Sequence, residues 1–483
     1  MVATVIGWLL VCEALTRVGL GVRVILRRCT SSQTMAWLLV LTFVPVVSSV
    51  AYLVIGENRL GSRRARRYVE TTARVRESVE RLVRDRDENW TARAVGYESL
   101  ARLLAASTGI PALKGNRLTL LESTDAFLRD LIREIDGAQQ HVHIVTFIWT
   151  TRGQAAEVGE AVARAAARGV CCRVIVDDVG SKEFTGSELE ARMRRAGARV
   201  VRCLPVNPVR FLLARIDIRN HRKIAVIDGR VAFTGSHNIA DPDFKMRQMP
   251  RVGRWVDATV RVEGPAVHAL QGVFLRDWAA DTEEDVGALD QYFPRVESGE
   301  GGSLVHVVPS GPGDRAEVIH HALLAMIHDA REELVLTTPY FVPDEATRAA
   351  LRIAARCGVA VTLILPERND HALVQAAGRS YYLELLEAGV RIAHYRKGLL
   401  HTKTCCVDRK MAVITSANLD MRSFFVNLEV SMFVFDESLS RDVRLMQERY
   451  LMDSVPVTEE SWRRRPVHRR FVENVCQVLG PLL

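Results

Sequence analysis

The sequence has few of the features that mark several large protein classes. Its nine cysteines are odd in number and none form a C-x-x-C pair, so neither a disulfide framework nor a cysteine-rich metal site is indicated. Aromatic residues make up only 6% of the chain, which leaves few side chains to stack on nucleic-acid bases. Hydrophobic residues at 48% and charged residues at 25% exclude a disordered or collagen-like chain. We therefore expect a globular protein with reduced cysteines, its folded part in the cytosol.

Length and charge narrow the possibilities further. The chain has 483 residues, enough for two or three domains. It carries 65 Lys and Arg against 57 Asp and Glu, a formal net charge of +8. This basic balance favours an anionic partner, either nucleic acid or a membrane surface, without choosing between them.

A long uncharged run lies near the N-terminus. Residues 36–56 (AWLLVLTFVPVVSSVAYLVIG) contain no charged side chain and could cross a hydrocarbon core of about 30 Å, so they predict a transmembrane helix. Trp37 and Tyr52 near its ends fit the aromatic belt of a membrane interface. Residues 2–26 are also apolar but carry three charges, which leaves open a second span or a helix lying in the interface.

Arginines on either side of residues 36–56 predict how this segment is oriented. The cluster that follows it is Arg59, Arg63, Arg64, Arg66 and Arg67, and the cluster that precedes it is Arg23, Arg27 and Arg28. Because basic residues stay on the cytoplasmic side, the larger cluster predicts that the rest of the chain lies on the cytoplasmic face of the inner membrane. Residues 71–90 then place apolar side chains at helical spacing, which predicts an amphipathic linker helix.

The remainder of the chain contains an internal duplication. Two β-α-β segments are expected, the first at 143–149, 155–168 and 172–177 and the second at 333–338, 345–357 and 359–365. Short matching phrases fix the register, such as AGARV from Ala196 and AGVRI from Ala388. The halves meet near ESGEGGS at 297–303. This pattern predicts two related α/β units.

Two segments of these units carry the same polar residues at the same spacing. Each reads H-x-K-x4-D followed by S-x-N, and each matching pair is separated by 180 residues. The pairs are His221 and His401, Lys223 and Lys403, Asp228 and Asp408, Ser236 and Ser416, and Asn238 and Asn418. Five polar residue types repeated in register indicate a functional site rather than an accident of composition.

The geometry of a strand explains the H-x-K spacing. Residues i and i+2 of a strand face the same side, so each His projects beside its Lys while the following residues enter the core. Two imidazoles facing each other, surrounded by two lysines and two amides, would form a site for a phosphodiester. One histidine would attack phosphorus and the other would protonate the leaving alkoxide. Asp228 and Asp408 follow strand residues into a turn, where a structural role is expected.

With this duplicated motif the chain resembles the phospholipase D superfamily over residues 105–483. Three phrases are similar to its bacterial cardiolipin synthase branch: RNHRK around His221, TTPYFVP at 337–343 and SANLDMRSF at 416–424. The resemblance implies a phosphatidyl-histidine intermediate, no metal and no other cofactor. It also implies transfer between two phosphatidylglycerol molecules, giving cardiolipin and glycerol.

The resemblance further implies roles for individual residues. The catalytic set is His221, Lys223, Asp228, His401, Lys403 and Asp408. The phosphate-binding or supporting set is Ser236, Asn238, Ser416, Asn418, Glu429 and Asp257. By position His221 matches the nucleophile and His401 the general acid and base, with the reverse division as the alternative.

Three positions carry further expectations. Glu429 matches the family acid that orients a histidine, and Asp257 either plays that part in the first half or makes a surface salt bridge. Thr415 stands where the family has a glycine, as at Gly235. A β-branched residue restricts the backbone, so the local geometry of the second half is in question.

The expected architecture is α/β, with two duplicated phospholipase D-type units packed about a pseudo-two-fold axis after one or two N-terminal transmembrane helices. The expected domains are a membrane segment (1–60), a basic amphipathic linker (61–105), unit 1 (106–296) and unit 2 with a basic C-terminal tail (297–483). The expected protein is a membrane-bound cardiolipin synthase that acts on phosphatidylglycerol at an anionic membrane and has no nucleic-acid partner. A hydrolytic phospholipase D or another phosphodiesterase of the superfamily is the alternative, and a non-catalytic phosphate-binding scaffold is a third option.

Overall fold

A computed structural model describes most of the chain. The described residues are 2–27, 31–57, 61–83, 94, 96–206, 215, 217–246, 248–284, 289–295, 302–315, 317–478 and 480. Most of the expected junction at 297–303, residues 84–90 of the expected linker helix, and Arg28 and Arg59 lie outside them. The chain divides into two compact parts: an N-terminal part within 1–62 and 206–218, and a main part within 63–205 and 219–483.

The N-terminal part contains three helices and corrects one prediction. They are α1 (Val2–Leu26), α2 (Ser31–Phe43) and α3 (Val47–Ile55). The single helix expected over 36–56 is wrong, because the chain turns between α2 and α3. Pro45 lies in this turn, has no backbone N–H and cannot continue a helix, and the next residue, Val46, has a φ of 64°. No helix in the described part of the chain is long and apolar enough to span a membrane.

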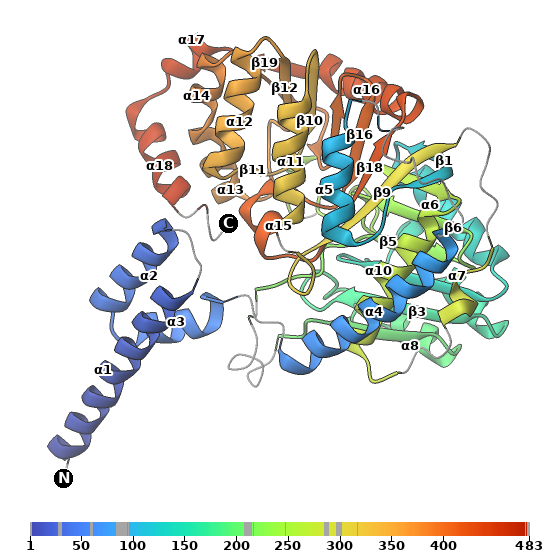
Figure 1. Cartoon of the computed structure of the whole chain (residues 1–483), viewed down its shortest axis with the longest axis horizontal. Coiled ribbons are helices and arrows are strands. Elements are labelled where there is room, and N and C mark those ends of the chain that lie inside the picture. The colour runs from blue at the N-terminus through green and yellow to red at the C-terminus, as the bar shows by residue number, and fades with distance from the viewer. Residues whose placement is uncertain are drawn as a thin grey trace. The chain divides into compact units, whose positions relative to one another are not determined.

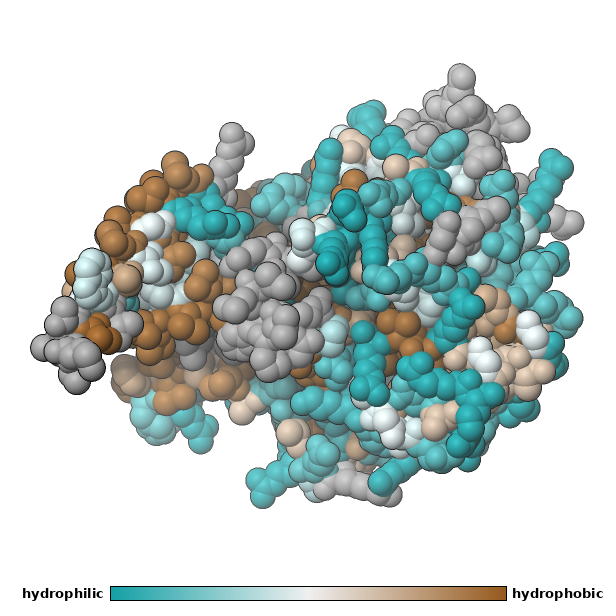
Figure 2. All heavy atoms as spheres, turned by 90° about the horizontal axis from the view of Figure 1, so that it is seen from below, coloured by the Kyte–Doolittle hydropathy of each residue, from teal (hydrophilic) through white to brown (hydrophobic). Residues whose placement is uncertain are grey.

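The surface of this N-terminal part is strongly apolar. Many large hydrophobic side chains of its helices are exposed, and Figure 2 shows them as brown spheres over much of this part. A carboxylate just after α3 contributes to its packing: Glu57 accepts hydrogen bonds from Arg23 (2.6 Å) and from the hydroxyl of Tyr52 (3.0 Å). These contacts join the end of α3 to α1.

The main part begins with α4 (Ser62–Val83), which packs against its core. Tyr68, Val75 and Val79 of α4 are buried. Arg64 is also buried and pairs with Asp281 at 2.6 Å. The helix expected as a linker is therefore docked on the main part, and one of the arginines expected to set membrane orientation is neutralised inside it. Helix α5 (Glu98–Thr108) follows.

A single 15-stranded sheet runs through the main part and carries the duplication (Figure 1). The first half supplies β1 (Leu113–Leu121), β2 (His141–Thr146), β3 (Cys171–Asp177), β4 (Arg199–Cys203), β5 (Ile224–Ile227), β6 (Val231–Gly235) and β8 (Thr259–Glu263). The second half supplies β9 (Ser303–Ser310), β10 (Glu333–Thr337), β12 (Ala360–Pro366), β13 (Arg391–Tyr395), β15 (Thr404–Val407), β16 (Met411–Thr415), β18 (Glu429–Phe435) and β19 (Ser454–Val457).

The strand order shows the internal symmetry. From the centre outward the first half runs β1-β8-β6-β5-β2-β3-β4, and the second half runs β9-β18-β16-β15-β10-β12-β13-β19. The two series match strand for strand until β19, which is added at one edge. β1 and β9 pair antiparallel at the centre, where Leu113 faces Val305. The predicted duplicated α/β fold is thus confirmed, and the two halves form one continuous sheet.

Helices cover this sheet, as expected when the outer strands are parallel and buried. In the first half they are α6 (Thr124–Gly137), α7 (Gly153–Ala167), α8 (Glu188–Arg195) and α10 (Ala266–Asp281). In the second half they are α11 (Val318–Asp329), α12 (Glu345–Arg356), α13 (Ala372–Ser380), α14 (Tyr382–Glu387), α15 (Met421–Phe425), α16 (Glu437–Met452), α17 (Glu459–Arg463) and α18 (Val467–Val478). Short strand pairs complete the fold: β7 (Trp255–Val256) with β14 (Leu399–Leu400), and β11 (Phe341–Val342) with β17 (Leu419–Asp420).

Candidate active site

The two H-x-K segments lie immediately before equivalent strands, β5 and β15, and each is held by the opposite half of the protein. The backbone N–H of His221 donates to the carbonyl of Leu428 at 2.9 Å. The backbone N–H of His401 donates to the carbonyl of Val256 at 2.7 Å. Because each segment pairs with the stretch that leads into the other half's acidic residue, the two halves build one shared site.

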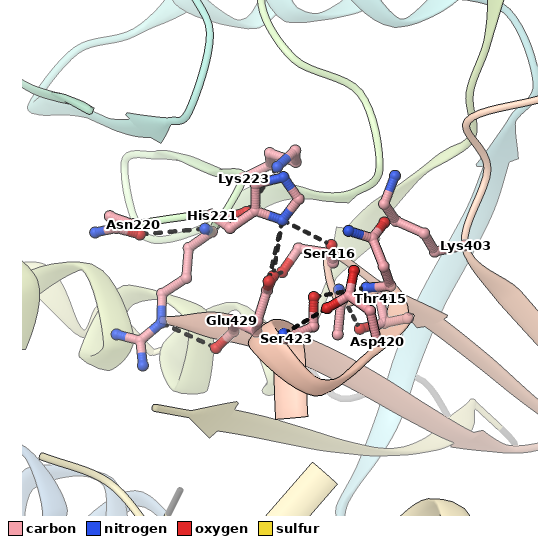
Figure 3. A network of polar contacts seen from close by, with 12 residues as sticks. Asn220, His221, Lys223, Lys403, Thr415, Ser416, Asp420, Ser423 and Glu429 are labelled. Atoms are coloured by element: carbon pink, nitrogen blue, oxygen red, sulfur yellow. Dashed lines mark hydrogen bonds and ion pairs between the residues drawn. The ribbon is translucent and has the colours of Figure 1, made fainter. Parts of the chain in front are cut away.

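This exchange places each histidine on a carboxylate from the other half. The Nδ1 atom of His221 lies 3.1 Å from the Glu429 carboxylate and 3.0 Å from the Ser416 carbonyl, as Figure 3 shows. The Nδ1 atom of His401 lies 2.7 Å from Oδ1 of Asp257. Asp257 was expected to serve the first half or to form a surface salt bridge. It is instead 96% buried and contacts the histidine of the second half, because β7 and β14 pair across the interface.

The charges of both acids are stabilised by what surrounds them. Burial alone would raise the pKa of Asp257, but the adjacent His401 outweighs it and holds that pKa well below its usual range. Burial would also raise the pKa of Glu429, yet His221, Lys223 and the Ser416 hydroxyl together lower it. Ser416 Oγ donates to Glu429 at 2.5 Å. Both carboxylates therefore stay ionised and fix the proton of each imidazole on Nδ1, leaving Nε2 for chemistry.

Aromatic rings flank the two imidazoles. The edge of the Phe147 ring meets His221 at a centroid distance of 5.0 Å, and the Trp255 ring lies 4.1 Å from His401. Burial lowers the pKa of His221, and burial together with Lys403 lowers that of His401 to about 3. Without substrate, both imidazoles are therefore neutral at physiological pH.

The two lysines are buried beside the imidazoles. Lys223 Nζ donates to the carbonyl of His221 at 2.7 Å, and Lys403 Nζ donates to that of His401 at 2.6 Å. Lys403 Nζ also lies 3.0 Å from Nε2 of His401. Burial lowers the pKa of Lys223 to about 8 and that of Lys403 to about 7. Keeping these ammonium groups charged in a buried site costs free energy. A phosphodiester anion placed between them would offset this cost, because it supplies the missing counter-charge.

The serines and asparagines of the motif have different surroundings. Ser236 Oγ is engaged with the backbone of Ala258, whose carbonyl lies at 3.2 Å and whose N–H lies at 3.1 Å. Asn238 Oδ1 accepts from the N–H of Ile148, whereas its Nδ2 is buried without a partner among the described residues. The side-chain oxygen of Asn418 is likewise buried and unpartnered within the described part of the chain. The serines thus fix strand ends, and the asparagines have amide atoms left for a ligand.

Asp228 and Asp408 lie at the far ends of β5 and β15. The Asp228 carboxylate accepts three backbone hydrogen bonds of 2.8 Å from residues 139–141. The Asp408 carboxylate accepts three of 2.7–2.9 Å from residues 331–333. Both residues adopt a positive φ near 50°. They tie the turn after the motif strand to the start of β2 or β10, so their contacts are structural.

The structure also explains the Gly235 and Thr415 difference. A Cβ at Gly235 would meet the carbonyl oxygen of Ala258 at 2.4 Å, so the first half needs glycine there. In the second half Thr415 Oγ1 bonds to the hydroxyl of Ser431 at 2.6 Å and accepts from the N–H of Ala417 at 2.9 Å. The threonine is accommodated and hydrogen-bonded, and Ser416 and Asn418 beside it keep their places.

A buried ion cluster behind His221 was not predicted. Arg222, the middle residue of the first H-x-K, has no exposed surface and pairs with Asp277 (2.5 Å) and Asp314 (2.6 Å). Its Nε donates to the Glu429 carbonyl at 3.0 Å, while Asn220 also binds Asp277. Both residues lie in the RNHRK phrase, but nothing in that phrase distinguishes a buried arginine from a surface one. The equivalent position in the second half is a threonine.

Within the described residues, no group of three or more His, Cys, Asp or Glu side chains is arranged to hold a metal ion. The site is instead a pair of carboxylate-bound imidazoles with two lysines and two amides, contributed by both halves of a duplicated sheet. This fold and this site define a protein of the phospholipase D type.

Comparisons with known proteins agree with this class. A family model described as cardiolipin synthase, PLD-like domain, matches residues 131–278 and 323–450, and one described as phospholipase D-nuclease N-terminal matches residues 20–57. Cardiolipin synthase A of Serratia proteamaculans is 39% identical, and that of Yersinia pseudotuberculosis 38%, each over 99% of both chains. The crystal structure of phosphatidylserine synthase from Haemophilus influenzae shares the fold, with a TM-score of 0.59 at 13% identity, covering 80% of this chain and 100% of that one. The chain belongs to the cardiolipin synthase family of phospholipase D-like proteins.

Proposed function

We propose that this protein is a cardiolipin synthase, a phosphatidyltransferase that joins two phosphatidylglycerol molecules and releases glycerol. The observation that carries the proposal is the pair of imidazoles, one from each half, with each Nδ1 atom on a carboxylate from the opposite half. Such a pair supplies a nucleophile and a separate proton donor to one phosphorus atom. Full-length similarity to proteins named cardiolipin synthase A supports the choice of lipid.

In the first step, Nε2 of His221 attacks the phosphorus of one phosphatidylglycerol. His221 is given this role because its position in the motif matches the nucleophile of the family; burial lowers the pKa of both imidazoles, so His221 is unprotonated and able to attack. The bond between phosphorus and the headgroup oxygen breaks, and His401 Nε2–H gives that oxygen a proton, so that glycerol leaves. A phosphate anion bound beside Lys223 and Lys403 offsets the positive charge that disfavours an imidazolium, so the pKa of His401 rises and His401 takes up a proton from solvent as the substrate binds.

The second step reverses the proton transfer. The neutral His401 removes the proton from a hydroxyl of the second phosphatidylglycerol, and the resulting oxygen attacks the phosphatidyl-histidine. The bond between phosphorus and His221 breaks, cardiolipin forms, and both histidines return to their starting states. Water in place of the second lipid would give phosphatidic acid, the product of a hydrolytic phospholipase D.

The remaining site residues stabilise charge on the phosphoryl oxygens. Lys223 and Lys403 are buried cations, and Nδ2 of Asn238 is a buried donor without a partner within the described chain. The unpartnered atom of Asn418 is Oδ1, which can only accept a hydrogen bond, so Asn418 is not counted among these donors. Fixed donors aimed at developing charge in a buried site stabilise the transition state without reorganisation. Asp257 and Glu429 act through the histidines that they orient, as positioning residues.

We also propose that the protein acts at the inner membrane, with its main part on the cytoplasmic side. The apolar surface of α1–α3 and the arginines that follow them support this placement. The proposed domain limits remain 1–60 for the membrane segment, 61–105 for the following helical region, 106–296 for the first unit and 297–483 for the second.

A product assay tests the function. Full-length protein in vesicles of labelled phosphatidylglycerol is expected to release glycerol and form cardiolipin. His221→Ala and His401→Ala are expected to abolish both products, whereas His328→Ala, which alters an exposed histidine on α11, leaves them unchanged. Formation of phosphatidic acid without cardiolipin would indicate a hydrolytic phospholipase D. Cardiolipin formation by His221→Ala would refute the proposed site.

A further inference from the structure

Helix α18, at the C-terminal end of the main part, has its apolar side chains turned outward. Val467, Phe471, Val475 and Val478 are 77%, 67%, 48% and 79% exposed. Their spacing of four, four and three residues puts them on one stripe of the helix. A surface helix of a globular protein normally buries such a stripe.

The inward face of α18 is occupied by other residues. Glu473 and Cys476 are buried, and Glu473 pairs with Arg465 just before the helix. Helix α18 packs against α13 through this face. Most of the surface of the apolar stripe is therefore left out of the packing of the main part, although the stripe contains Phe471, the largest hydrophobic side chain of the helix.

The charges on α18 favour an anionic partner. His468, Arg469 and Arg470 are exposed, and the two arginines have no acidic partner among the residues that the structure describes. The helix has one acidic residue, Glu473, which is already paired with Arg465. A stripe of Val and Phe with an unpaired arginine, Arg470, at its flank, on a helix with net positive charge, is typical of helices that lie in the interface of an anionic bilayer.

A chain of contacts connects this helix to the candidate active site. Helix α13, on which α18 packs, lies against β11, which directly follows Tyr340. The Tyr340 hydroxyl donates to Asp370 at 2.7 Å, and Asp370 pairs with Lys245 at 2.6 Å. Lys245 lies over the Trp255 ring, which packs on His401. The helix thus belongs to the part of the second half that borders the reacting groups.

We propose that α18 is a membrane-binding helix whose stripe, Val467, Phe471, Val475 and Val478, enters the interface of an anionic bilayer. Arg470, at the flank of the stripe, contacts the lipid phosphates, and Arg469, on the opposite side of the helix, adds to the attraction of the helix to the anionic surface. The proposal rests on the proposed function only in that a lipid substrate makes such contact useful. It gives the main part a point of attachment to the membrane independent of α1–α3.

Site-specific labelling tests the contact. Val467→Cys is placed in the full-length protein, and the protein is reconstituted in nanodiscs of phosphatidylcholine with or without phosphatidylglycerol. Labelling by a water-soluble maleimide is followed on the tryptic peptide that contains position 467. With phosphatidylglycerol present, labelling is expected to be at least about fivefold slower than in the variant that also carries Arg469→Glu and Arg470→Glu, since each basic residue near an anionic surface contributes about that factor.

Ile353→Cys is the matched control, because Ile353 is an apolar residue of α12 that is 51% exposed outside the stripe. Its labelling is expected to be equal in all nanodiscs. Labelling at 467 as fast as at 353 with phosphatidylglycerol present would overturn the proposal. Slow labelling that is indifferent to both lipid composition and the arginine changes would also overturn it, since it would show that protein covers the stripe.

Activity measurements separate this proposal from the proposed function. Phe471→Glu with Val475→Glu is expected to lower turnover of phosphatidylglycerol in vesicles at least about fivefold, while turnover of a short-chain phosphatidylglycerol dissolved as monomers stays unchanged. If the variant turned over both substrates as fast as the unaltered protein does, a role of α18 at the membrane would be contradicted. Absence of turnover of either substrate by the unaltered protein would contradict the proposed function and leave the labelling result to decide on α18.

Discussion

The crossed pairing of acids and histidines predicts that each acid affects the step performed by the other half's histidine. Asp257→Asn removes the charge from a fully buried contact of 2.7 Å with His401. A hydrogen bond to a charged group contributes about 1.5–3 kcal/mol, so the proton-transfer step of His401 is expected to slow by about 10- to 150-fold. Glu429→Gln changes a longer contact of 3.1 Å with His221, for which the lower end of that range is expected.

A substrate with an activated leaving group separates the two steps. Phosphatidyl-p-nitrophenol loses a phenolate that needs no proton, so release of the phenol depends on the nucleophile and not on the general acid. Asp257→Asn is expected to release the first equivalent of nitrophenol at the normal rate, measured as a pre-steady-state burst, while turning over phosphatidylglycerol slowly. Glu429→Gln is expected to slow both reactions.

The matched control is Asp344→Asn, because Asp344 also binds a histidine, His320, at 3.0 Å but lies on α12 outside the H-x-K segments. It is expected to leave both substrates unaffected. A slower burst of the first equivalent of nitrophenol in Asp257→Asn, with a normal burst in Glu429→Gln, would refute the division of roles between the histidines. Equal effects of both variants on both substrates would refute separate roles altogether.

Three other predictions follow from the contacts of the site. The pKa values of Lys403 and Lys223 are lowered to about 7 and about 8, so both lysines lose their charge over this range. The value of kcat/KM for phosphatidylglycerol is therefore expected to fall as pH rises through it. Lys403→Arg stays charged and is expected to move this fall to higher pH in a pH-rate profile. Asp228→Ala leaves three backbone N–H groups unpaired and is expected to lower the free energy of unfolding by about 2–4 kcal/mol in denaturant titrations, with kcat of the folded protein little changed. Gly235→Ala is expected to destabilise the protein by about 3 kcal/mol or more in the same titration, whereas Thr415→Gly costs about 1–2 kcal/mol through lost hydrogen bonds; equal costs would contradict the explanation of this difference between the halves.

Much of the fold was predictable because both halves repeat the same pattern. The strand expected at 172–177 lies within β3, and the helix expected at 345–357 coincides with α12 to within a residue. Buried parallel strands and Ala-rich helices are local features that hydrophobic periodicity reports directly. The continuous helix expected over 36–56 is wrong because Pro45 interrupts it between α2 and α3, although the composition of the segment is that of a single span.

Contacts across the two halves were beyond sequence reasoning. Asp257 is only two residues before β8, and nothing in RWVD shows that it faces His401, 144 residues away. Arg222 is equally hidden, since its burial depends on Asp277 and Asp314 from α10 and the turn after β9. Spacing within a motif predicts which side chains share a face, whereas exchange between duplicated halves depends on how the halves associate.

Covalent labelling of the nucleophile tests the central claim most directly. His401→Ala with phosphatidyl-p-nitrophenol labelled at phosphorus is expected to release one equivalent of nitrophenol and then stall, because the second step needs His401 as the base. After an alkaline quench and tryptic digestion, the label is expected in the peptide Asn220–Arg222, attached to His221. Label at any other residue, or nitrophenol release without label on the protein, would contradict a phosphatidyl-histidine at His221 and with it the mechanism proposed for this site.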